Sequence, residues 1–228
     1  MITAWSFSRY STYAQCPRKA RYLYIDKLKE PGSPAMERGN EIHKLAERYI
    51  KGQVARLPPV LALFRASFSA LRKAFKDDRT SIAVEETWAF RRDWTRTTWD
   101  DWNGCWLRVK LDVAHVIEGN VVIIDHKTGK FSPSYNLQQY MEQLDLYALA
   151  SLIVYPSHSV TPFLRFLDHE IVYPEEPITY VPADLPRLKK EWERRTKPML
   201  RDRTFAPKPN SLCRFCHFRK DNGGPCVY

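Results

Sequence analysis

The spacing of apolar side chains changes several times along this chain of 228 residues. Apolar positions three or four residues apart predict helices at residues 34–51, 59–76, 137–154 and 184–200. Alternating or continuous apolar positions predict strands at residues 81–91, 106–117 and 120–127, and one or two more within 160–173. This order of elements indicates an α/β fold, a mixed β-sheet flanked by helices.

Shorter signals refine the boundaries. Residues 6–28 mix aromatic and basic side chains and predict one or two short helices broken at Pro17. Ser33 can cap the helix that follows, which is expected to end at Gly52. Residues 92–105 predict a tryptophan-rich hairpin loop. Alternation within 81–91 is expected to put four apolar side chains on one face, those of Ile82, Val84, Trp88 and Phe90.

Size and composition are those of one folded domain spanning residues 1–228. Hydrophobic residues make up 44% and charged residues 27%, so the chain can bury a core. No apolar run approaches the roughly 18 residues of a membrane span, and the N-terminus does not read as a secretory signal. We therefore expect no membrane partner and a cytoplasmic protein of a bacterial, archaeal or phage-infected cell.

Positive charge gathers at the two ends of the chain. Lys and Arg exceed Asp and Glu by 36 − 26 = 10, and the excess lies within residues 9–29 and 187–220. Such segments favour a polyanionic partner, with Arg18 and Lys19 as candidate nucleic-acid contacts. The nearby aromatics either stack on bases of a single strand or belong to the core, namely Phe7, Tyr10 and Tyr13.

Two acids and a lysine interrupt two apolar strands. Asp125 and Lys127 share one face of the strand at 120–127, and Asp112 lies on the neighbouring hairpin strand. Carboxylates that emerge together from apolar strands repel each other and favour a cation between them. Oxygen ligands with room for water suit Mg²⁺ or Mn²⁺. Lys127 beside that ion could orient a water or stabilise charge on a phosphate.

Further ligands come from outside this hairpin. Gly39 and His43 are one helical turn apart, so the glycine lets the helix approach the sheet while the imidazole reaches the metal. Glu85 or Glu86 offers a third acid in the middle of the first strand. The alternation pattern alone does not decide between these two glutamates.

Together these motifs resemble the RecB-like nuclease family of the PD-(D/E)xK superfamily. The matching pieces are a G-x-x-x-H at 39–43, Asp112, a D-x-K-T-G-K at 125–130 and a Q-x-x-x-Y at 143–147. The likeness runs from about residue 6 to the C-terminus and implies a restriction-endonuclease-like core. The D-x-K-T-G-K motif followed one helix later by Q-L-x-L-Y-A is the specific part of the match.

The resemblance implies a role for each matching residue. His43, Asp112 and Asp125 would bind the metal together with the backbone carbonyl of His126, and Lys127 would be the catalytic lysine. Gln143 and Tyr147 would support the site or touch DNA. The family's first-strand glutamate most resembles Glu85.

Three of the five cysteines crowd into the last 16 residues. An odd number of cysteines without an export signal argues against disulfides and for a metal or cluster. The resemblance implies a 4Fe-4S cluster, as in CRISPR-adaptation exonucleases, held by Cys16, Cys213, Cys216 and Cys226. Such a cluster would join residues 1–30 and 184–228 into one basic lobe. Zinc remains an alternative, either on four cysteines or with His217 as one ligand.

These features predict a Mg²⁺- or Mn²⁺-dependent DNA nuclease with a structural 4Fe-4S cluster, more an exonuclease than an endonuclease. Its substrate would be single-stranded or end-containing DNA, in recombination or repair, CRISPR adaptation or phage replication. A free-standing enzyme of this size would work with a partner or as a homo-oligomer. The rival interpretations are a non-catalytic basic DNA-binding module and a zinc-stapled interaction protein.

Overall fold

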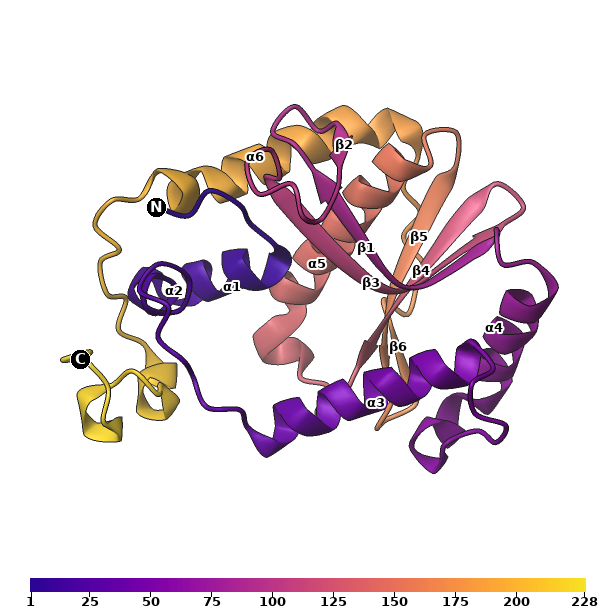
Figure 1. Cartoon of the computed structure of the whole chain (residues 1–228), viewed down its shortest axis with the longest axis horizontal. Helices are drawn as coiled ribbons and strands as arrows, with labels where there is room; N and C mark the ends of the chain where they lie inside the picture. The colour runs from indigo at the N-terminus through magenta and orange to yellow at the C-terminus, as the bar shows by residue number, and fades with distance from the viewer.

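A six-stranded mixed β-sheet with helices on both faces forms the core of the molecule (Figure 1). The computed structural model describes the backbone of residues 1–228 and the side chains of all of them except residues 133–135. The strand order is β2-β1-β3-β4-β5-β6. The strands are β1 (Ile82–Phe90), β2 (Arg96–Thr97), β3 (Leu107–Ile117), β4 (Asn120–Lys127), β5 (Ser159–Phe166) and β6 (Ile171–Tyr173). The predicted α/β class with a mixed sheet is confirmed.

Six α-helices accompany the sheet. They are α1 (Phe7–Gln15), α2 (Pro17–Tyr24), α3 (Pro34–Ile50), α4 (Arg65–Asp77), α5 (Pro133–Val154) and α6 (Leu185–Arg201). Ser33 caps α3 as predicted, since its side chain accepts a hydrogen bond from the Met36 amide. The predicted helix at 59–76 is a 3₁₀ segment, Pro59–Phe64, followed by α4, and α5 starts four residues earlier than expected. No helix in the described structure could span a bilayer.

The sheet divides where β3 and β4 part. Their antiparallel pairing stops at Val113 and Ile124, although β3 continues along β1 to Leu107 and β4 continues along β5 to Lys127. Asp112 and Asp125 are the first residues beyond this fork. The β4–β5 pair is parallel and is connected by the crossover helix α5. The fork therefore presents two carboxylates from strands that no longer pair with each other.

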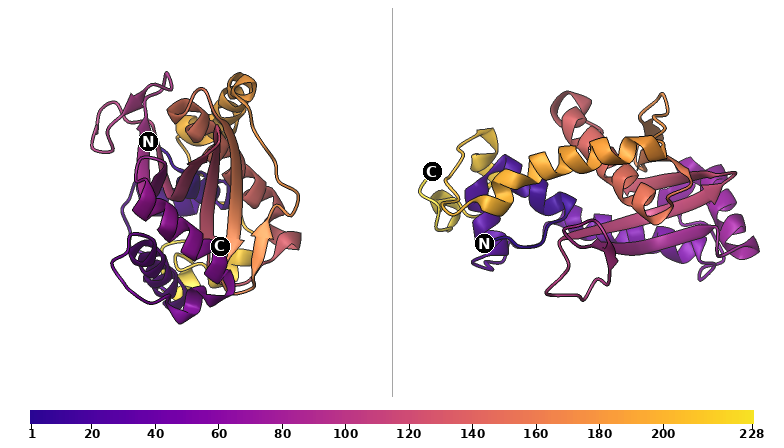
Figure 2. Two further views of the ribbon diagram at one scale, coloured as in Figure 1. Left: turned by 90° about the vertical axis from the view of Figure 1, so that its right-hand side faces the viewer. Right: turned by 90° about the horizontal axis from the view of Figure 1, so that it is seen from above.

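Helices cover the two faces of the sheet unequally (Figure 2). One face packs on α1, α5 and α6, and its core includes Trp5, Ile123, Leu149 and Trp192. The opposite face packs on α3 and α4, and its core includes Ile42, Ile50, Phe68 and Ile124. Consecutive residues such as Ile123 and Ile124 enter opposite cores, as strand alternation requires.

The prediction that Ile82, Val84, Trp88 and Phe90 share one face is wrong. Ile82 and Val84 pack in the core beneath α3 and α4, whereas Trp88 and Phe90 pack in the core beneath α5 and α6. Between the two pairs, Glu85 has a φ of 55°, a left-handed value that is rare for a residue with a side chain. This local turn of the backbone shifts the alternation of β1 beside the fork.

The two ends of the chain lie side by side, at the indigo and yellow ends of the ribbon in Figure 1. The Tyr13 hydroxyl donates a hydrogen bond of 2.7 Å to Asp202, and Arg18 donates one of 2.9 Å to the Phe205 carbonyl. The rings of Tyr22 and Phe218 pack with centroids 5.2 Å apart. Ordinary packing and hydrogen bonds thus join the N-terminal helix pair to the C-terminal tail.

Candidate active site

The site lies at the fork of the sheet, where backbone groups lose their strand partners. The amide of His126 donates a hydrogen bond of 2.6 Å to Asp112 Oδ2. Asp112 thereby satisfies a buried donor that β3 would have satisfied if the two strands had stayed paired. Asp112 is 8% exposed, and this hydrogen bond orients its carboxylate at the opening of the fork.

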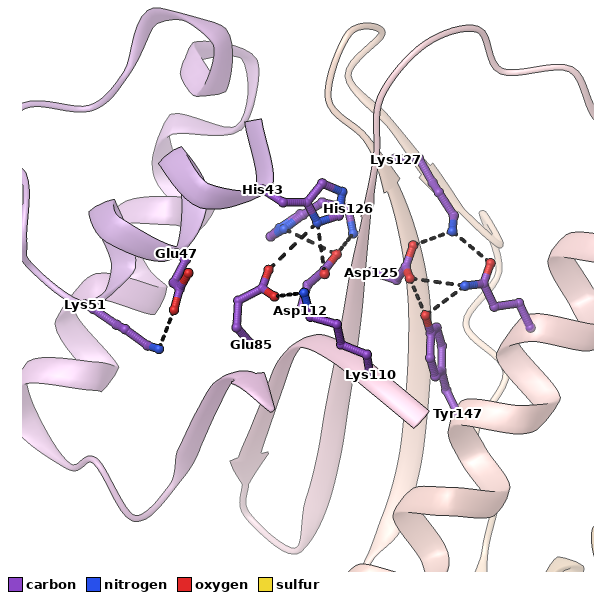
Figure 3. A network of polar contacts seen from close by, with 11 residues as sticks. His43, Glu47, Lys51, Glu85, Lys110, Asp112, Asp125, His126, Lys127 and Tyr147 are labelled. Atoms are coloured by element: carbon purple, nitrogen blue, oxygen red, sulfur yellow. Dashed lines mark hydrogen bonds and ion pairs between the residues drawn. The ribbon is translucent and has the colours of Figure 1, made fainter. Parts of the chain in front are cut away.

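His43 reaches Asp112 from the middle of α3 (Figure 3). Its Nδ1 lies 3.0 Å from Asp112 Oδ1. The helix approaches closely one turn earlier, because a Cβ on Gly39 would lie only 3.1 Å from Thr128 Oγ1. The glycine of the predicted G-x-x-x-H therefore lets α3 sit against the D-x-K-T-G-K segment.

Three side chains converge closely enough to share a metal ion. One ligand atom each from His43, Glu85 and Asp112 lies within 4.8 Å of the others. The imidazole and two carboxylates form a donor set suited to a divalent ion. The expected ligand Asp125 lines the same groove but is not part of this group of three. Glu85 takes its place in the set that the geometry brings together.

Asp125 is instead the centre of a second network, shown beside the first in Figure 3. Its Oδ1 accepts hydrogen bonds from the Tyr147 hydroxyl and from Gln143 Nε2. Lys127 Nζ lies 2.7 Å from Asp125 Oδ2 and donates to Gln143 Oε1 at 2.8 Å. The predicted helical pair Gln143 and Tyr147 therefore fixes the strand pair Asp125 and Lys127 from the α5 side.

The alternation pattern did not decide whether Glu85 or Glu86 faces the site, and the structure shows that it is Glu85. Glu85 turns toward His43, with 3.9 Å between Oε1 and Nδ1, while Glu86 is not among the residues that line the groove. A residue absent from the sequence prediction, Lys110, lies 2.6 Å from Glu85 Oε2. Its position two residues before Asp112 on one strand is the signal that could have identified it.

Charge and burial oppose each other at this cluster. Burial lowers the pKa of His43, but the hydrogen bond and charge of Asp112, with Asp125 and Glu85, outweigh it, so the pKa lies above its usual value. Burial raises the pKa of Asp112, and repulsion from Asp125 adds to the effect. The cluster therefore holds protons more tightly than free side chains do.

The loop after β4 is tied to α3. Asp168 accepts a hydrogen bond of 2.7 Å from the Gly129 amide and forms a bidentate pair with Arg38 at 2.6 and 2.9 Å. Gly129 itself has a φ of 95°, a conformation that favours glycine. Arg38 and Asp168, which the sequence pattern did not single out, connect the T-G-K turn to the helix that carries His43.

The four cysteines expected to act together line a single cavity of 150 Å³ near the joined chain ends. Among the described side chains, no three of their sulfur atoms lie within 4.8 Å of one another. Arg18 and Lys19 line the same cavity rather than the groove at the fork. Arg18 is bonded to the Phe205 carbonyl and Lys19 to Glu30 at 2.9 Å.

Residues 4–220 match the sequence pattern of the PD-(D/E)XK nuclease superfamily. The chain belongs to this superfamily. The match includes both strands of the fork, α3 and α5, and so covers every element that contributes to the site. Asp125-His126-Lys127 has the (D/E)-x-K pattern that appears in the superfamily's name, and Asp112 precedes it on the neighbouring strand.

Two solved structures resemble this PD-(D/E)XK nuclease. A protein of Eubacterium rectale named "Putative exonuclease" is 12% identical, with a TM-score of 0.50, and the alignment covers 99% of this chain and 89% of that one. The crystal structure of SSO0001 is 15% identical, with a TM-score of 0.44 and coverage of 96% and 85%. At these identities the first likeness concerns the fold alone. No curated protein matches the chain in sequence.

Proposed function

We propose that this chain is a divalent-metal-dependent deoxyribonuclease of the RecB-like branch, acting as an exonuclease. The observation that carries the proposal is the grouping of His43, Glu85 and Asp112 at the fork, next to the network that holds Lys127. A binding module would gain nothing from buried carboxylates that face a phosphate. The name of the Eubacterium rectale neighbour agrees with the exonuclease mode.

The donor set fits Mg²⁺ or Mn²⁺, since two carboxylates and an imidazole meet in a groove that leaves room for water. His43, Glu85 and Asp112 would hold the ion, with Asp125 and the His126 carbonyl completing the site. When bound, such an ion supplies a Lewis acid and lowers the pKa of a coordinated water. The raised pKa of Asp112 reflects charge that a cation would neutralise.

The chain's own residues orient the reaction. Lys127 Nζ is held by Asp125 and Gln143, so its ammonium is fixed beside the fork. It places positive charge where a phosphodiester gains negative charge and helps a water to attack in line. The bond to the 3′-oxygen breaks and leaves a 5′-phosphate. Buried Tyr147 holds Asp125 in the position that makes this arrangement possible.

Cleavage of end-labelled single- and double-stranded DNA tests this proposal. Wild-type protein is compared in Mg²⁺, Mn²⁺ or EDTA with two variants of adjacent residues, Glu85→Gln and Glu86→Gln. We expect metal-dependent cleavage that falls by about tenfold or more in Glu85→Gln, because one charged ligand is lost, and that persists in Glu86→Gln. DNA binding without cleavage in any metal would support the non-catalytic rival.

Metal binding is expected to weaken as the pH falls. His43 must be neutral to bind a metal, and its raised pKa keeps it protonated to higher pH than an ordinary imidazole. The ion pair between His43 and Asp112 stabilises the metal-free protein below this pKa and is lost as the pH rises through it. Titration with Mn²⁺ should show affinity dropping about tenfold per pH unit below that pKa.

Two histidine variants control this measurement. His43→Gln should remove most of the dependence on pH, whereas His169→Gln, at an exposed position, should retain it. Histidine titrates between about pH 6 and about pH 8. An affinity for Mn²⁺ that stays constant over this range would contradict a role for His43 in binding the metal.

We further propose that Cys16, Cys213, Cys216 and Cys226 hold a 4Fe-4S cluster that clasps residues 1–30 and 184–228 into a basic lobe. The support is that all four line one cavity, whereas His217 is not among the described residues that line it. A thiolate set of this kind suits iron–sulfur clusters and zinc alike. The cluster would strengthen the contacts that already join the chain ends.

Serine substitution of the cysteines separates these alternatives. Cys213→Ser in protein purified without oxygen should lose bound iron and lower the melting temperature by about 5 °C or more. Cys105→Ser is the matched control, because Cys105 is buried in the loop just before β3 and does not line that cavity. If the protein contains stoichiometric zinc and no iron, the cysteines hold a zinc site instead of a cluster. If it contains neither zinc nor iron, the proposed clasp is wrong.

A further inference from the structure

The loop between β1 and β3 carries four tryptophans with opposite roles. Trp94 and Trp106 are 5% and 8% exposed, and their rings meet edge to face with centroids 5.0 Å apart. Trp99 and Trp102 are 38% and 79% exposed. The first pair fastens the loop to the core, and the second pair is displayed to solvent. A projecting loop of this kind is visible in Figure 2.

The exposed rings are held in place. The Arg108 guanidinium lies 5.5 Å from the Trp99 ring centroid and 5.3 Å from that of Trp102, and it donates two hydrogen bonds to the Trp99 carbonyl. Asp101 accepts hydrogen bonds from the Gly104 amide at 2.8 Å and from Thr97 Oγ1 at 2.5 Å. These contacts pre-organise an aromatic surface that covers no core.

Basic side chains surround this surface. A cavity of 810 Å³ beside Trp102 is lined by Arg92 from the loop and by Lys197 and Arg201 from α6. None of these three forms an ion pair or a side-chain hydrogen bond with another described residue. The one acid in the lining, Glu193, already accepts a hydrogen bond from Trp94 Nε1 at 2.8 Å. The cavity therefore offers positive charge without an internal partner.

A line of side chains leads from this surface to the metal ligands. Arg108, Lys110 and Asp112 alternate along one face of β3, because Val109 and Leu111 between them point into the core beneath α5 and α6. At a rise of about 3.4 Å per residue, Arg108 and Asp112 are about 14 Å apart along the strand. The face between them carries Lys110, whose side chain is 61% exposed and whose ammonium pairs with Glu85.

We propose that the loop Arg91–Trp106 is a binding platform for single-stranded DNA. A base stacks on Trp102, the flanking phosphates contact Arg92, Lys197 and Arg201, and the strand continues past Arg108 and Lys110 to the fork. An exposed indole can stack on an unstacked base, and basic side chains without an internal partner can bind the phosphates of the DNA backbone. The path to the fork rests on the proposed nuclease function, whereas binding to the platform does not.

Trp102 also replaces the aromatics first considered for stacking. Tyr10 is buried, and Phe7 and Tyr13 are partly buried against the same core, where the three rings pack on Trp192 or Phe205.

Binding of a fluorescently labelled single strand in EDTA tests the platform apart from cleavage. Trp102→Ala should raise the dissociation constant about tenfold, with little change in affinity for the matching duplex. Trp102→Phe, which retains an aromatic face, should stay within about threefold of wild type. Leu63→Ala, at another exposed apolar position, is the control for a general surface effect. Unchanged binding by Trp102→Ala, or an equal loss for the duplex, overturns the proposal.

Two further readouts separate this platform from the catalytic site. Replacing Arg92, Lys197 and Arg201 by glutamine should reduce the slope of log affinity against log salt concentration by about 2, because three phosphate contacts are lost. Hydrolysis of bis(p-nitrophenyl) phosphate, too small to reach Trp102, should be unchanged in Trp102→Ala. Loss of that hydrolysis together with DNA binding in Trp102→Ala would indicate misfolding, and in that case an unchanged salt slope in the triple glutamine variant overturns the platform. A wild type that binds the strand but hydrolyses nothing refutes the nuclease while the platform stands.

Discussion

Asp112→Asn is expected to reduce DNA cleavage by about 10³-fold or more while leaving the protein folded. The substitution removes a negative charge from the group of His43, Glu85 and Asp112, and so weakens the hold on a divalent ion. The amide oxygen of asparagine can still accept the hydrogen bond from the His126 amide. Cleavage rates at saturating and limiting Mn²⁺ would show whether the loss lies in metal binding or in the chemical step.

The thermal stability of Asp112→Asn should not fall along with its cleavage activity. Burial and the charge of Asp125 raise the pKa of Asp112, so the ionised carboxylate is unfavourable in the metal-free protein. At a pH above the pKa of His43, where the ion pair between His43 and Asp112 is absent, a neutral amide removes that repulsion, and we expect the melting temperature without metal to be unchanged or higher. Asp77→Asn on the surface of α4 serves as the control. If Asp112→Asn retained more than about a tenth of the wild-type rate at limiting metal, the proposed ligand set would be wrong.

Lys127→Met is expected to lower cleavage by about 10²- to 10³-fold without weakening metal binding. Methionine keeps much of the length of the side chain but removes the ammonium that Asp125 and Gln143 hold beside the fork. Because Lys127 is outside the group of three ligands, the dissociation constant for Mn²⁺ should stay near that of wild type. The variant should therefore bind metal and DNA and fail in the chemical step.

Lys130→Met provides the matched comparison, since Lys130 lies three residues later in the same motif and is exposed. It should cleave DNA at nearly the wild-type rate. Asp125 keeps its hydrogen bonds from Tyr147 and Gln143 in Lys127→Met, so the melting temperature should change little. A large drop in melting temperature, or equal losses in the two lysine variants, would argue that Lys127 acts by packing or by general charge instead.

Most of the elements could be predicted from the sequence because they depend on local periodicity. Strands β3 and β4 and helices α3 and α6 lie within a few residues of the predicted ranges. The pairing of Asp125 with Lys127 on one strand face follows from the two-residue period of a β-strand, and Gln143 meets Tyr147 through the helical repeat. The spacing of Gly39 and His43 also predicted that His43 would reach the acids of the sheet, and it lies beside Asp112 because α3 approaches the sheet closely at Gly39.

Other features depend on contacts between segments that are distant in the sequence, and these contacts form only when the chain folds. The left-handed backbone at Glu85 breaks the alternation of β1, so no count along the sequence could choose Glu85 over Glu86. The parting of β3 from β4 gives Asp112 and Asp125 separate partners. Local patterns fix which faces are apolar, whereas strand pairing decides which polar side chains meet.

The tryptophans of the loop also show the difference between what local sequence patterns and long-range packing decide. Composition shows that tryptophan is abundant in residues 92–106, but not which rings become anchors and which remain exposed. Trp94 is buried because Trp106 at the end of the loop and Glu193 of α6 pack against it, and Trp102 is exposed because none of the described segments covers it. Local patterns along the chain thus specify the order of elements and the motif residues of the nuclease. Long-range packing determined the ligand set and the surface on which a substrate strand would lie.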